Sequence, residues 1–517
     1  MKKIDASRRL FLRHAGVMST LGAAGGPLAL NLSAIGTAAA QTASDYKAIV
    51  CIFLFGGNDS INMVLPTDAA SFSNYTTLRN QAPDSIALLA PGTAADAGAG
   101  TGSPARLGGV LPITPANSQG RTFALHPAMG TLQTMFNTDK RLAVLPNVGP
   151  LILPTSKTQY GQASHPKPAS LFSHNDQQNT WQSFRPEGAT VGWGGRMGDL
   201  LASTNSRTVF TSITAGGNAV WLSGNEVRQY QVTNSGAIRL GTSANGQVYN
   251  SLAVGQAMER IVMTTRGGHL LETDLSAVAA RSMQAESLLR NALKPASDPL
   301  FGTAPASGNY SATNDPKLRY ADPSNPATTI ANPLAQQLQI VARMIEASSN
   351  AAIGAKRQVF FVSMGGFDTH DAQNTNHAQL MARLAHAMRY FDDTLGAIGA
   401  RNQVTTFTAS DFGRTFTSNG DGTDHGWGAH HFVMGGAVRG GDLYGTFPVY
   451  GAKNANNNNF DSSPDQLGNG SLLPTTSVDQ LGATMGKWFG LSDSQLLDVF
   501  PNLANFTARD LGFMNPA

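Results

Sequence analysis

The sequence has little cysteine, little charge and no long apolar segment after its N-terminus. Cys51 is its only cysteine, which excludes an intramolecular disulfide. Charged residues make up 13% of the 517 positions, half of the roughly 25% usual in globular proteins. Polar uncharged side chains therefore carry much of the surface. No later segment approaches the roughly 18 uncharged apolar positions of a membrane-spanning helix, so we expect no span after the N-terminal segment.

The chain also lacks the basic excess that its formal net charge of +3 suggests. Residues 1–40 contain five basic side chains and one acid. Without them, 31 basic and 32 acidic residues remain, a net charge of −1. Such a balance favours neither nucleic acid nor an anionic lipid surface as a partner. We expect no nucleic-acid partner.

The N-terminus has the pattern of an export signal. Residues 7–13 read SRRLFLR, a twin-arginine pattern, and a mildly apolar stretch leads to three alanines at 38–40. We predict a signal peptide over residues 1–40, passage through the twin-arginine translocase and a periplasmic or secreted protein. An amphipathic first helix is the alternative. Residues 41–517 are predicted to form a single domain with an insertion near 197–328.

Alternating strand and helix patterns predict an α/β fold. Residues 46–55 form a nearly continuous apolar run, which is typical of a strand buried on both faces. Asn332 and the proline after it mark the start of a helix. A strand over 358–362, a helix over 377–398 and a strand over 404–408 follow.

Acidic and imidazole side chains follow these predicted strands. In open α/β sheets, ligands bind beyond the carboxyl ends of the strands, so we expect one shared site. Carboxylates and imidazoles suit divalent cations, and two ions about 4 Å apart can assist a hydrolytic displacement. Each such residue could instead cap a helix or hold a loop. The predicted metal ligands are Asp59, Asp368, His370, Asp411, and His425 or His430.

Two further residues are candidates for catalysis. Ser173 stands where a helix could begin, so its hydroxyl is either a nucleophile or a helix N-cap. Arg414 follows Asp411 closely and either binds an oxyanion or forms an ion pair. His377 and His386 lie nine positions apart on one predicted helix and point to opposite sides, so we expect surface positions for both.

These segments together resemble the bacterial "domain of unknown function 1501" family over essentially the whole mature chain. The resemblance is carried by the twin-arginine start, FGGNDS at 55–60, SH at 173–174, GGFDTH at 365–370, SDFGRT at 410–415 and DHGWG at 424–428. Twin-arginine export is common in that family, which looks like a distant branch of the alkaline phosphatase, sulfatase and phosphoglycerate mutase superfamily.

The resemblance implies a three-layer fold with a mixed, mostly parallel central sheet, loop-rich insertions and a centre of one or two divalent ions (Zn, Mn or Ca). Asp59, Asp368, His370, Asp411, and His425 or His430 match ligand positions of the superfamily, and Ser173 matches its nucleophile. Two departures concern the metal site. The superfamily has its Asp and His four residues apart, whereas Asp368 and His370 are two apart, and Phe412 replaces a ligand after Asp411. A single or altered metal site therefore fits this chain better than a full two-metal site.

Two functions of different classes follow. One is an exported metal-dependent hydrolase of phosphate or sulfate esters, acting on a small-molecule or glycan substrate. The other is a non-catalytic protein of the cell envelope that binds a glycan or a protein partner during assembly. Redox chemistry has little support, since no CxxC motif accompanies the single cysteine. Fold analogy alone does not separate the first two.

Overall fold

The computed structural model describes residues 45–237, 246–264 and 269–515. The chain divides into two units, and the described residues belong almost entirely to the second, Tyr46–Ala517. The predicted signal peptide, 1–40, lies outside the described residues. None of the described helices is long and apolar enough to cross a membrane.

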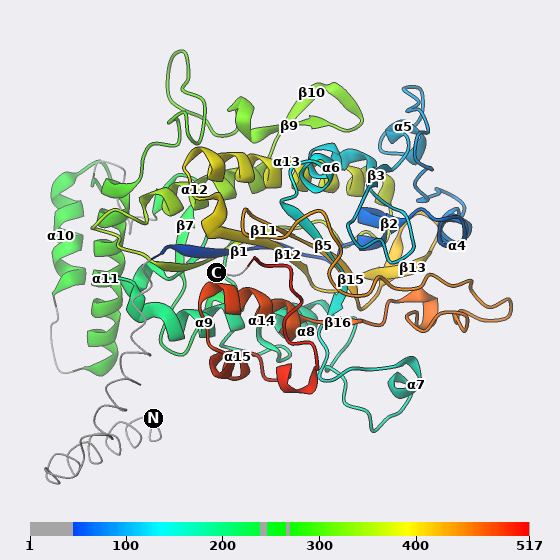
Figure 1. Ribbon diagram of the computed structural model, residues 1–517. Helices are drawn as coiled ribbons and strands as arrows, with labels where there is room; N and C mark the ends of the chain where they lie inside the picture. Colours follow the sequence, from blue (N-terminus) through cyan, green and yellow to red (C-terminus); the bar gives the residue numbers. More distant parts are fainter. Residues whose placement is uncertain (1–44, 238–245, 265–268, 516–517) are drawn as a thin grey trace, which may run out of the picture. The chain divides into compact units, whose positions relative to one another are not determined.

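A nine-stranded sheet forms the centre of this unit (Figure 1). Five of its neighbouring strand pairs are parallel and three are antiparallel. In spatial order its strands are β16 (Thr476–Ser477), β5 (Leu142–Gly149), β15 (Ala429–Met434), β12 (Val404–Ser410), β1 (Lys47–Leu54), β11 (Arg357–Met364), β6 (Ser212–Thr214), β7 (Tyr230–Thr233) and β8 (Gly236–Ala237).

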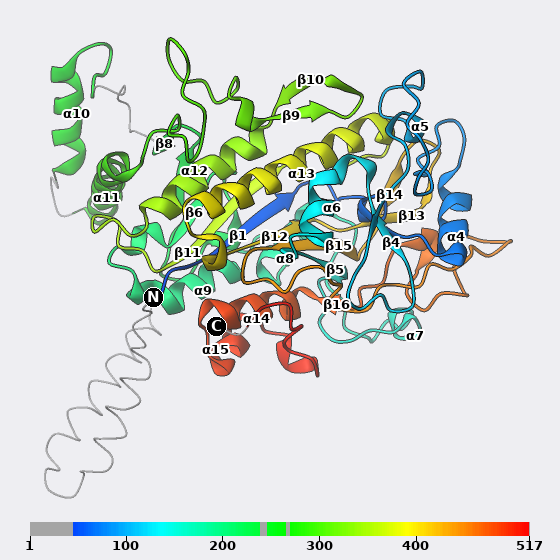
Figure 2. The ribbon, with the colours of Figure 1, turned by 45° about the horizontal axis from the view of Figure 1, so that its top comes forward.

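Helices cover both faces of this sheet (Figure 2). One layer contains α6, α12 and α13, and the opposite layer contains α8, α9, α14 and α15. In chain order the helices are α3 (Ser60–Met63), α4 (Ala69–Arg79), α5 (Pro104–Leu107), α6 (Gly130–Asn137), α7 (Lys157–Tyr160), α8 (His174–Ser183), α9 (Trp193–Leu201), α10 (Leu252–Met263), α11 (Leu270–Ala292), α12 (Pro333–Ala347), α13 (Gln373–Ala397), α14 (Val478–Phe489) and α15 (Asp493–Val499).

Strand β1 shows why the sheet is buried on both sides. Val50, Ile52 and Leu54 belong to one hydrophobic core, together with residues of α12 and α13. Cys51 and Phe53 point the other way, into a second core with residues of α9 and α14. Successive side chains of a strand face opposite sides, so a continuous apolar run fills two cores at once. The prediction of an α/β fold with a mixed, mostly parallel sheet between helical layers is confirmed.

Local signals placed the helices on either side of β11. The Asn332 side chain accepts hydrogen bonds from the backbone N–H groups of Leu334 and Ala335, as expected of an N-cap before a first-turn proline. Helix α13 begins four residues earlier than predicted and also buries His377, at 2% exposure. The surface position predicted for His377 is therefore wrong, because the loop after β1 covers this turn of α13: the Nε2 atom of His377 lies 3.2 Å from the Asn58 side chain.

Within the described ranges, three small sheets lie outside the central one. They are β2 (Val64–Pro66) with β4 (Phe123–Leu125) and β3 (Leu111–Ile113), β9 (Arg319–Asp322) with β10 (Asn325–Ala331), and β13 (Arg414–Ser418) with β14 (Thr423–His425). The hairpin of β13 and β14 pairs Arg414 with His425 and so returns the chain to the end of β12. The insertion near 197–328 stays a prediction.

Candidate metal centre

Three parallel strands deliver the first part of the site. Leu54 at the end of β1 is in register with Met364 of β11 and with Ser410 of β12. The loops after these strands therefore leave the sheet side by side. The Gly56 backbone N–H donates a hydrogen bond to the Asp411 carboxylate (3.1 Å), which ties the first of these loops to the third.

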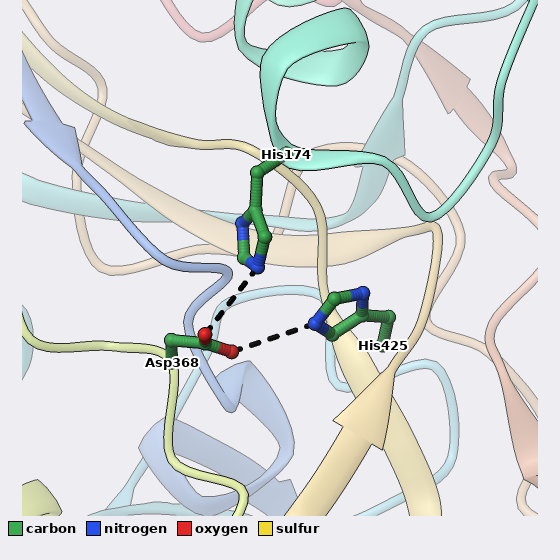
Figure 3. A group of neighbouring side chains, drawn as sticks. All are labelled: His174, Asp368 and His425. Carbon is green, nitrogen blue, oxygen red and sulfur yellow. Dashed lines mark ion pairs between the residues drawn. The ribbon is translucent and has the colours of Figure 1, made fainter.

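His174, Asp368 and His425 converge beyond these strand ends (Figure 3). The Nε2 atom of His174 lies 3.5 Å from one Asp368 carboxylate oxygen, and the Nε2 atom of His425 lies 3.4 Å from the other. One potential ligand atom from each residue falls within 4.8 Å of the others. We call these three residues the His–Asp–His cluster.

Bonds on the far side of each ring orient the two imidazoles. The Nδ1 atom of His174 lies 2.7 Å from Oδ2 of Asp411. The Nδ1 atom of His425 lies 2.7 Å from the carbonyl oxygen of Phe172. A carbonyl or carboxylate oxygen only accepts, so each ring carries its hydrogen on Nδ1. In the neutral rings each Nε2 atom therefore carries the lone pair, as in metal-binding histidines. The lone pair of His174 has no hydrogen-bond partner, whereas Nε2 of His425 also lies 2.9 Å from Nε2 of His370.

The donor set fits a divalent cation. The Nε2 atom of His174 is buried without a hydrogen-bond partner, which is costly unless something else satisfies it. Two imidazole nitrogens and one carboxylate suit Zn²⁺ or a similar transition metal better than Ca²⁺, which prefers oxygen ligands. The Asp368 side chain is 48% exposed, so the cluster is accessible to solvent.

The electrostatics of the cluster differ from residue to residue. The hydrogen bond from His174 to Asp411 raises the pKa of His174, against the effect of burial. Burial lowers the pKa of His425. Burial alone would raise the pKa of Asp368, but the hydrogen bond and the charge of Arg414 outweigh it and lower that pKa. The Asp368 carboxylate is therefore ionised at neutral pH.

Arg414 is fully buried and holds the loops around Asp368 together. Its guanidinium donates to the Asp368 carboxylate and to the carbonyl oxygens of Gly56 (2.6 Å) and Gly57 (2.8 Å). The carbonyl oxygens of Phe367 and Thr423 accept further bonds of 3.1 Å each. The Arg414 guanidinium thus donates to backbone carbonyl oxygens of neighbouring loops. Its contact with the His–Asp–His cluster is the ion pair to Asp368.

His370 borders the cluster. Its Nε2 atom lies 2.9 Å from Nε2 of His425 and 3.2 Å from Oδ1 of Asp368. Its Nδ1 atom lies 3.3 Å from the Asp424 carboxylate.

Asp411 contacts the cluster through His174 only. Its Oδ2 atom accepts hydrogen bonds from Gly56, His174 and Gln178. Of the predicted ligands, the structure thus brings together Asp368, His370, Asp411 and His425.

Asp59 lies outside the cluster. Its fully buried carboxylate receives two bonds from Arg79 (2.5 and 3.0 Å) and one from Gln373 (2.5 Å). The Gln373 side chain in turn accepts hydrogen bonds from the hydroxyls of Thr369 (3.2 Å) and Thr423 (2.9 Å). Thr369 follows Asp368 directly, and Thr423 begins the strand β14 that ends at His425. Asp59 therefore supports the site through a chain of hydrogen bonds.

His430 also lies outside the cluster. Its Nδ1 atom accepts from the Asn147 backbone N–H (3.0 Å), so its Nε2–H faces the Tyr450 hydroxyl (3.0 Å). Neither ring nitrogen keeps a free lone pair. Of the two histidines left open by the sequence, His425 is the one that reaches Asp368.

Ser173 is the N-cap residue of α8, but its side chain makes no capping hydrogen bond. It is half-buried, between Phe172, whose carbonyl orients His425, and His174. Sequence reasoning missed His174 as a potential ligand, since it appeared only as part of the SH motif at 173–174. The signal was its place beside Ser173 in a motif shared with the resembled family.

The fold and the cluster define a class: an α/β protein with histidine and carboxylate side chains gathered at the carboxyl edge of a mostly parallel sheet. The chain belongs to the family described as Protein of unknown function (DUF1501), whose model matches residues 46–500. This result confirms the family resemblance found in the sequence.

Solved structures with which the chain aligns are only distantly similar. The crystal structure of Ps i-CgsB in complex with k-i-k-neocarrahexaose is 8% identical, with 89% of this chain and 77% of that chain covered and a TM-score of 0.33. A structure from work on the metabolism of multiple glycosaminoglycans by Bacteroides thetaiotaomicron is 10% identical, with 87% and 74% covered and a TM-score of 0.31. No curated protein matches the sequence significantly.

Proposed function

We propose that this protein is an exported, metal-dependent hydrolase of phosphate or sulfate esters. The observation that carries the proposal is the His–Asp–His cluster, in which two imidazoles with Nδ1 already bonded turn Nε2 toward one ionised carboxylate. His174, Asp368 and His425 would hold one divalent ion, Zn²⁺ or Mn²⁺ in preference to Ca²⁺. Such an ion supplies Lewis-acid polarisation of an ester oxygen.

The surroundings of the cluster support an anionic substrate. His370 contributes an imidazole group beside Asp368. Ser173 begins a ten-residue helix next to His174, and a helix N-terminus favours negative charge. Its hydroxyl, which does not cap the helix, is the candidate nucleophile. The role of Arg414 in this proposal is to keep Asp368 in place, because its own donors are taken up by backbone carbonyls.

The sequence resemblance extends the proposal. It implies a distant relation to the alkaline phosphatase and sulfatase superfamily, and the twin-arginine pattern implies export to the periplasm or beyond. We propose one ion rather than two. Phe412 stands in place of a ligand, and the Asp59 carboxylate is engaged by Arg79.

A binding or assembly protein of the cell envelope is the second candidate. The feature that favours it is Arg414, because a buried guanidinium paired with Asp368 lowers the affinity of that carboxylate for a cation. In this alternative the cluster is a polar binding surface without a resident ion.

Metal analysis of protein exported through its own signal separates the two. We expect about one equivalent of Zn or Mn in the wild type and loss of that metal in Asp368→Asn. Asp498→Asn, at an exposed position of α15, is the matched control and should keep the metal. Hydrolysis of p-nitrophenyl phosphate or sulfate should fall with metal content. Gently purified wild type without stoichiometric metal would favour the binding role.

A further inference from the structure

Helices α10 and α11 carry a group of exposed apolar side chains. The two helices pack against each other (Figure 1). The second half of α11 packs on the hydrophobic core through Ala285 and Leu289. Its first half exposes Leu271 (72%), Leu275 (70%) and Val278 (54%). Single exposed leucines are common, but a contiguous group of them marks an interaction surface.

The spacing of these residues defines one face of each helix. Leu271, Leu275 and Val278 stand at positions i, i+4 and i+7 of α11. On α10, three residues with the same spacing are also exposed: Val254 (39%), Met258 (39%) and Ile261 (55%). A stripe with this period is the surface that helices bury against other helices. Each helix therefore has a stripe of the kind that packs in a helical bundle.

The charges on the two helices favour a protein partner over a lipid surface. Helices that lie on membranes are rich in lysine and arginine on their polar face. In contrast, α10 and α11 together have a slight acidic excess. Their acidic residues are Glu259, Glu272, Asp274 and Glu286, and their basic residues are Arg260, Arg281 and Arg290.

Two opposite charges beside the stripe of α11, Asp274 and Arg281, can pair with the same two residues of a second copy. Asp274 and Arg281 are seven residues apart, so they lie on the same flank of the stripe. In an antiparallel pair of identical helices related by a two-fold axis, each flank faces the same flank of the other copy. If Leu275 lies opposite Val278 of the second copy, Asp274 lies within about 3 Å along the axis of the second copy's Arg281, at 1.5 Å per residue. The two Asp274 residues are then about 7.5 Å apart along the axis.

We propose that the exposed stripe of α11 is a homodimerisation surface. Two copies of the chain associate through antiparallel α11 helices, with the two-fold axis between Leu275 and Val278. The reciprocal pairing of Asp274 with Arg281 favours the antiparallel arrangement, because in a parallel pair each flank faces the opposite flank of the second copy and these two charges do not meet. This inference uses none of the residues of the proposed metal centre and stands independently of it.

Sedimentation velocity of the purified exported protein over a range of concentrations tests the association. We expect a dimer in the wild type and a monomer in Leu275→Glu, with unchanged helix content by circular dichroism. Leu497→Glu is the matched control, at a 39% exposed leucine of α15, and should remain dimeric. A monomeric wild type, or a dimer that Leu275→Glu leaves intact, would overturn the proposal.

Charge reversal tests the arrangement. Asp274→Arg and Arg281→Asp should each raise the dimer dissociation constant about fivefold, and the double variant should restore it, since exposed ion pairs contribute modestly and two are formed. No restoration would contradict the antiparallel register. Co-sedimentation of a monomeric wild type with phosphatidylglycerol vesicles, abolished by Leu275→Glu, would assign the surface to lipid and overturn the dimer.

Discussion

The Nδ1 atom of His174 lies 2.7 Å from the Oδ2 atom of Asp411, a side chain with no exposed surface. The two residues are 237 positions apart and come from a helix start and a strand end. Asp411 fixes which nitrogen of His174 carries the hydrogen and so turns Nε2 toward Asp368. Loss of a carboxylate that orients a metal-binding histidine in this way typically lowers metal affinity about 10- to 100-fold.

Asp411→Asn should weaken metal binding with little change in fold. An asparagine can present its amide N–H₂ to His174, which removes the preference for hydrogen on Nδ1. We expect a 10- to 100-fold rise in the dissociation constant of Zn²⁺, the order usual for such outer partners. Competition with a chromogenic chelator measures it, with Asp498→Asn as control. Equal affinities in the two variants would exclude Asp411 from positioning His174.

Asp59→Asn separates a structural role from a ligand role. The change leaves Arg79 charged and buried without its partner, which costs about 3–5 kcal/mol for a broken buried pair. Urea unfolding should show this loss of stability, while the metal content of the folded fraction stays at the wild-type level. Loss of metal without loss of stability would instead make Asp59 a ligand, as the sequence predicts.

Gly56→Ala should disrupt the metal centre. Gly56 has φ +115°, and a Cβ atom there would come 2.4 Å from the backbone nitrogen of Asp368. The loops of β1 and β11 would have to separate, which moves Asp368. Gly365→Ala is the matched control one loop away, since its Cβ would meet nothing within 4 Å. We expect loss of metal and a lower melting temperature in the first variant only. Similar behaviour of both would mean that the close approach at Gly56 is unimportant.

Buried imidazoles should make the protein sensitive to acid. Burial lowers the pKa of His430 and of His431 to about 3, and that of His377 to about 4. Between about pH 6.5 and these values the unfolded chain binds more protons than the folded one, so stability falls as the pH falls. Each group contributes up to about 1.4 kcal/mol per pH unit.

His431→Leu tests this pH dependence, because the ring of His431 packs against Trp181 and leucine retains an apolar contact. Denaturant unfolding at pH 4, 5 and 6 should give a shallower dependence of the unfolding free energy on pH than in the wild type. An identical slope would show that His431 does not stay neutral in the folded state across this range.

Helices and strands with strong local signals were predictable from the sequence. Helix α14 ends before Gly490, which has φ +119°, and α15 begins at the capping box of Ser492 and Gln495. The continuous apolar run of β1 predicted a doubly covered strand. These features depend on residues within a few positions of one another, so they can be inferred without knowledge of the rest of the chain.

The composition of the site was only partly predictable. Asp368, His370 and Asp411 follow strand ends, and strand ends of a parallel sheet meet at one edge. That rule says nothing about side-chain orientation or long-range partners. Asp59 also follows a strand, yet its carboxylate accepts hydrogen bonds from Arg79 and Gln373 and does not reach the cluster. Apart from its place beside Ser173, His174 showed no local sign of a ligand, because its orientation comes from Asp411 at a distant strand end.

The sequence by itself predicted the α/β architecture and several helix ends, because apolar periodicity, capping residues and glycine positions act over short distances. The family was recognised from the resemblance of motifs such as GGFDTH at 365–370 and SDFGRT at 410–415. The tertiary structure decided which side chains form the cluster and which candidates form hydrogen bonds or ion pairs with other residues instead. His425 faces Asp368 because the β13–β14 hairpin and the Phe172 carbonyl orient it. His430, five residues later, bonds to Asn147 and Tyr450 instead. The physical reason is that each imidazole has two nitrogens, and the partner of one nitrogen determines what the other can bind.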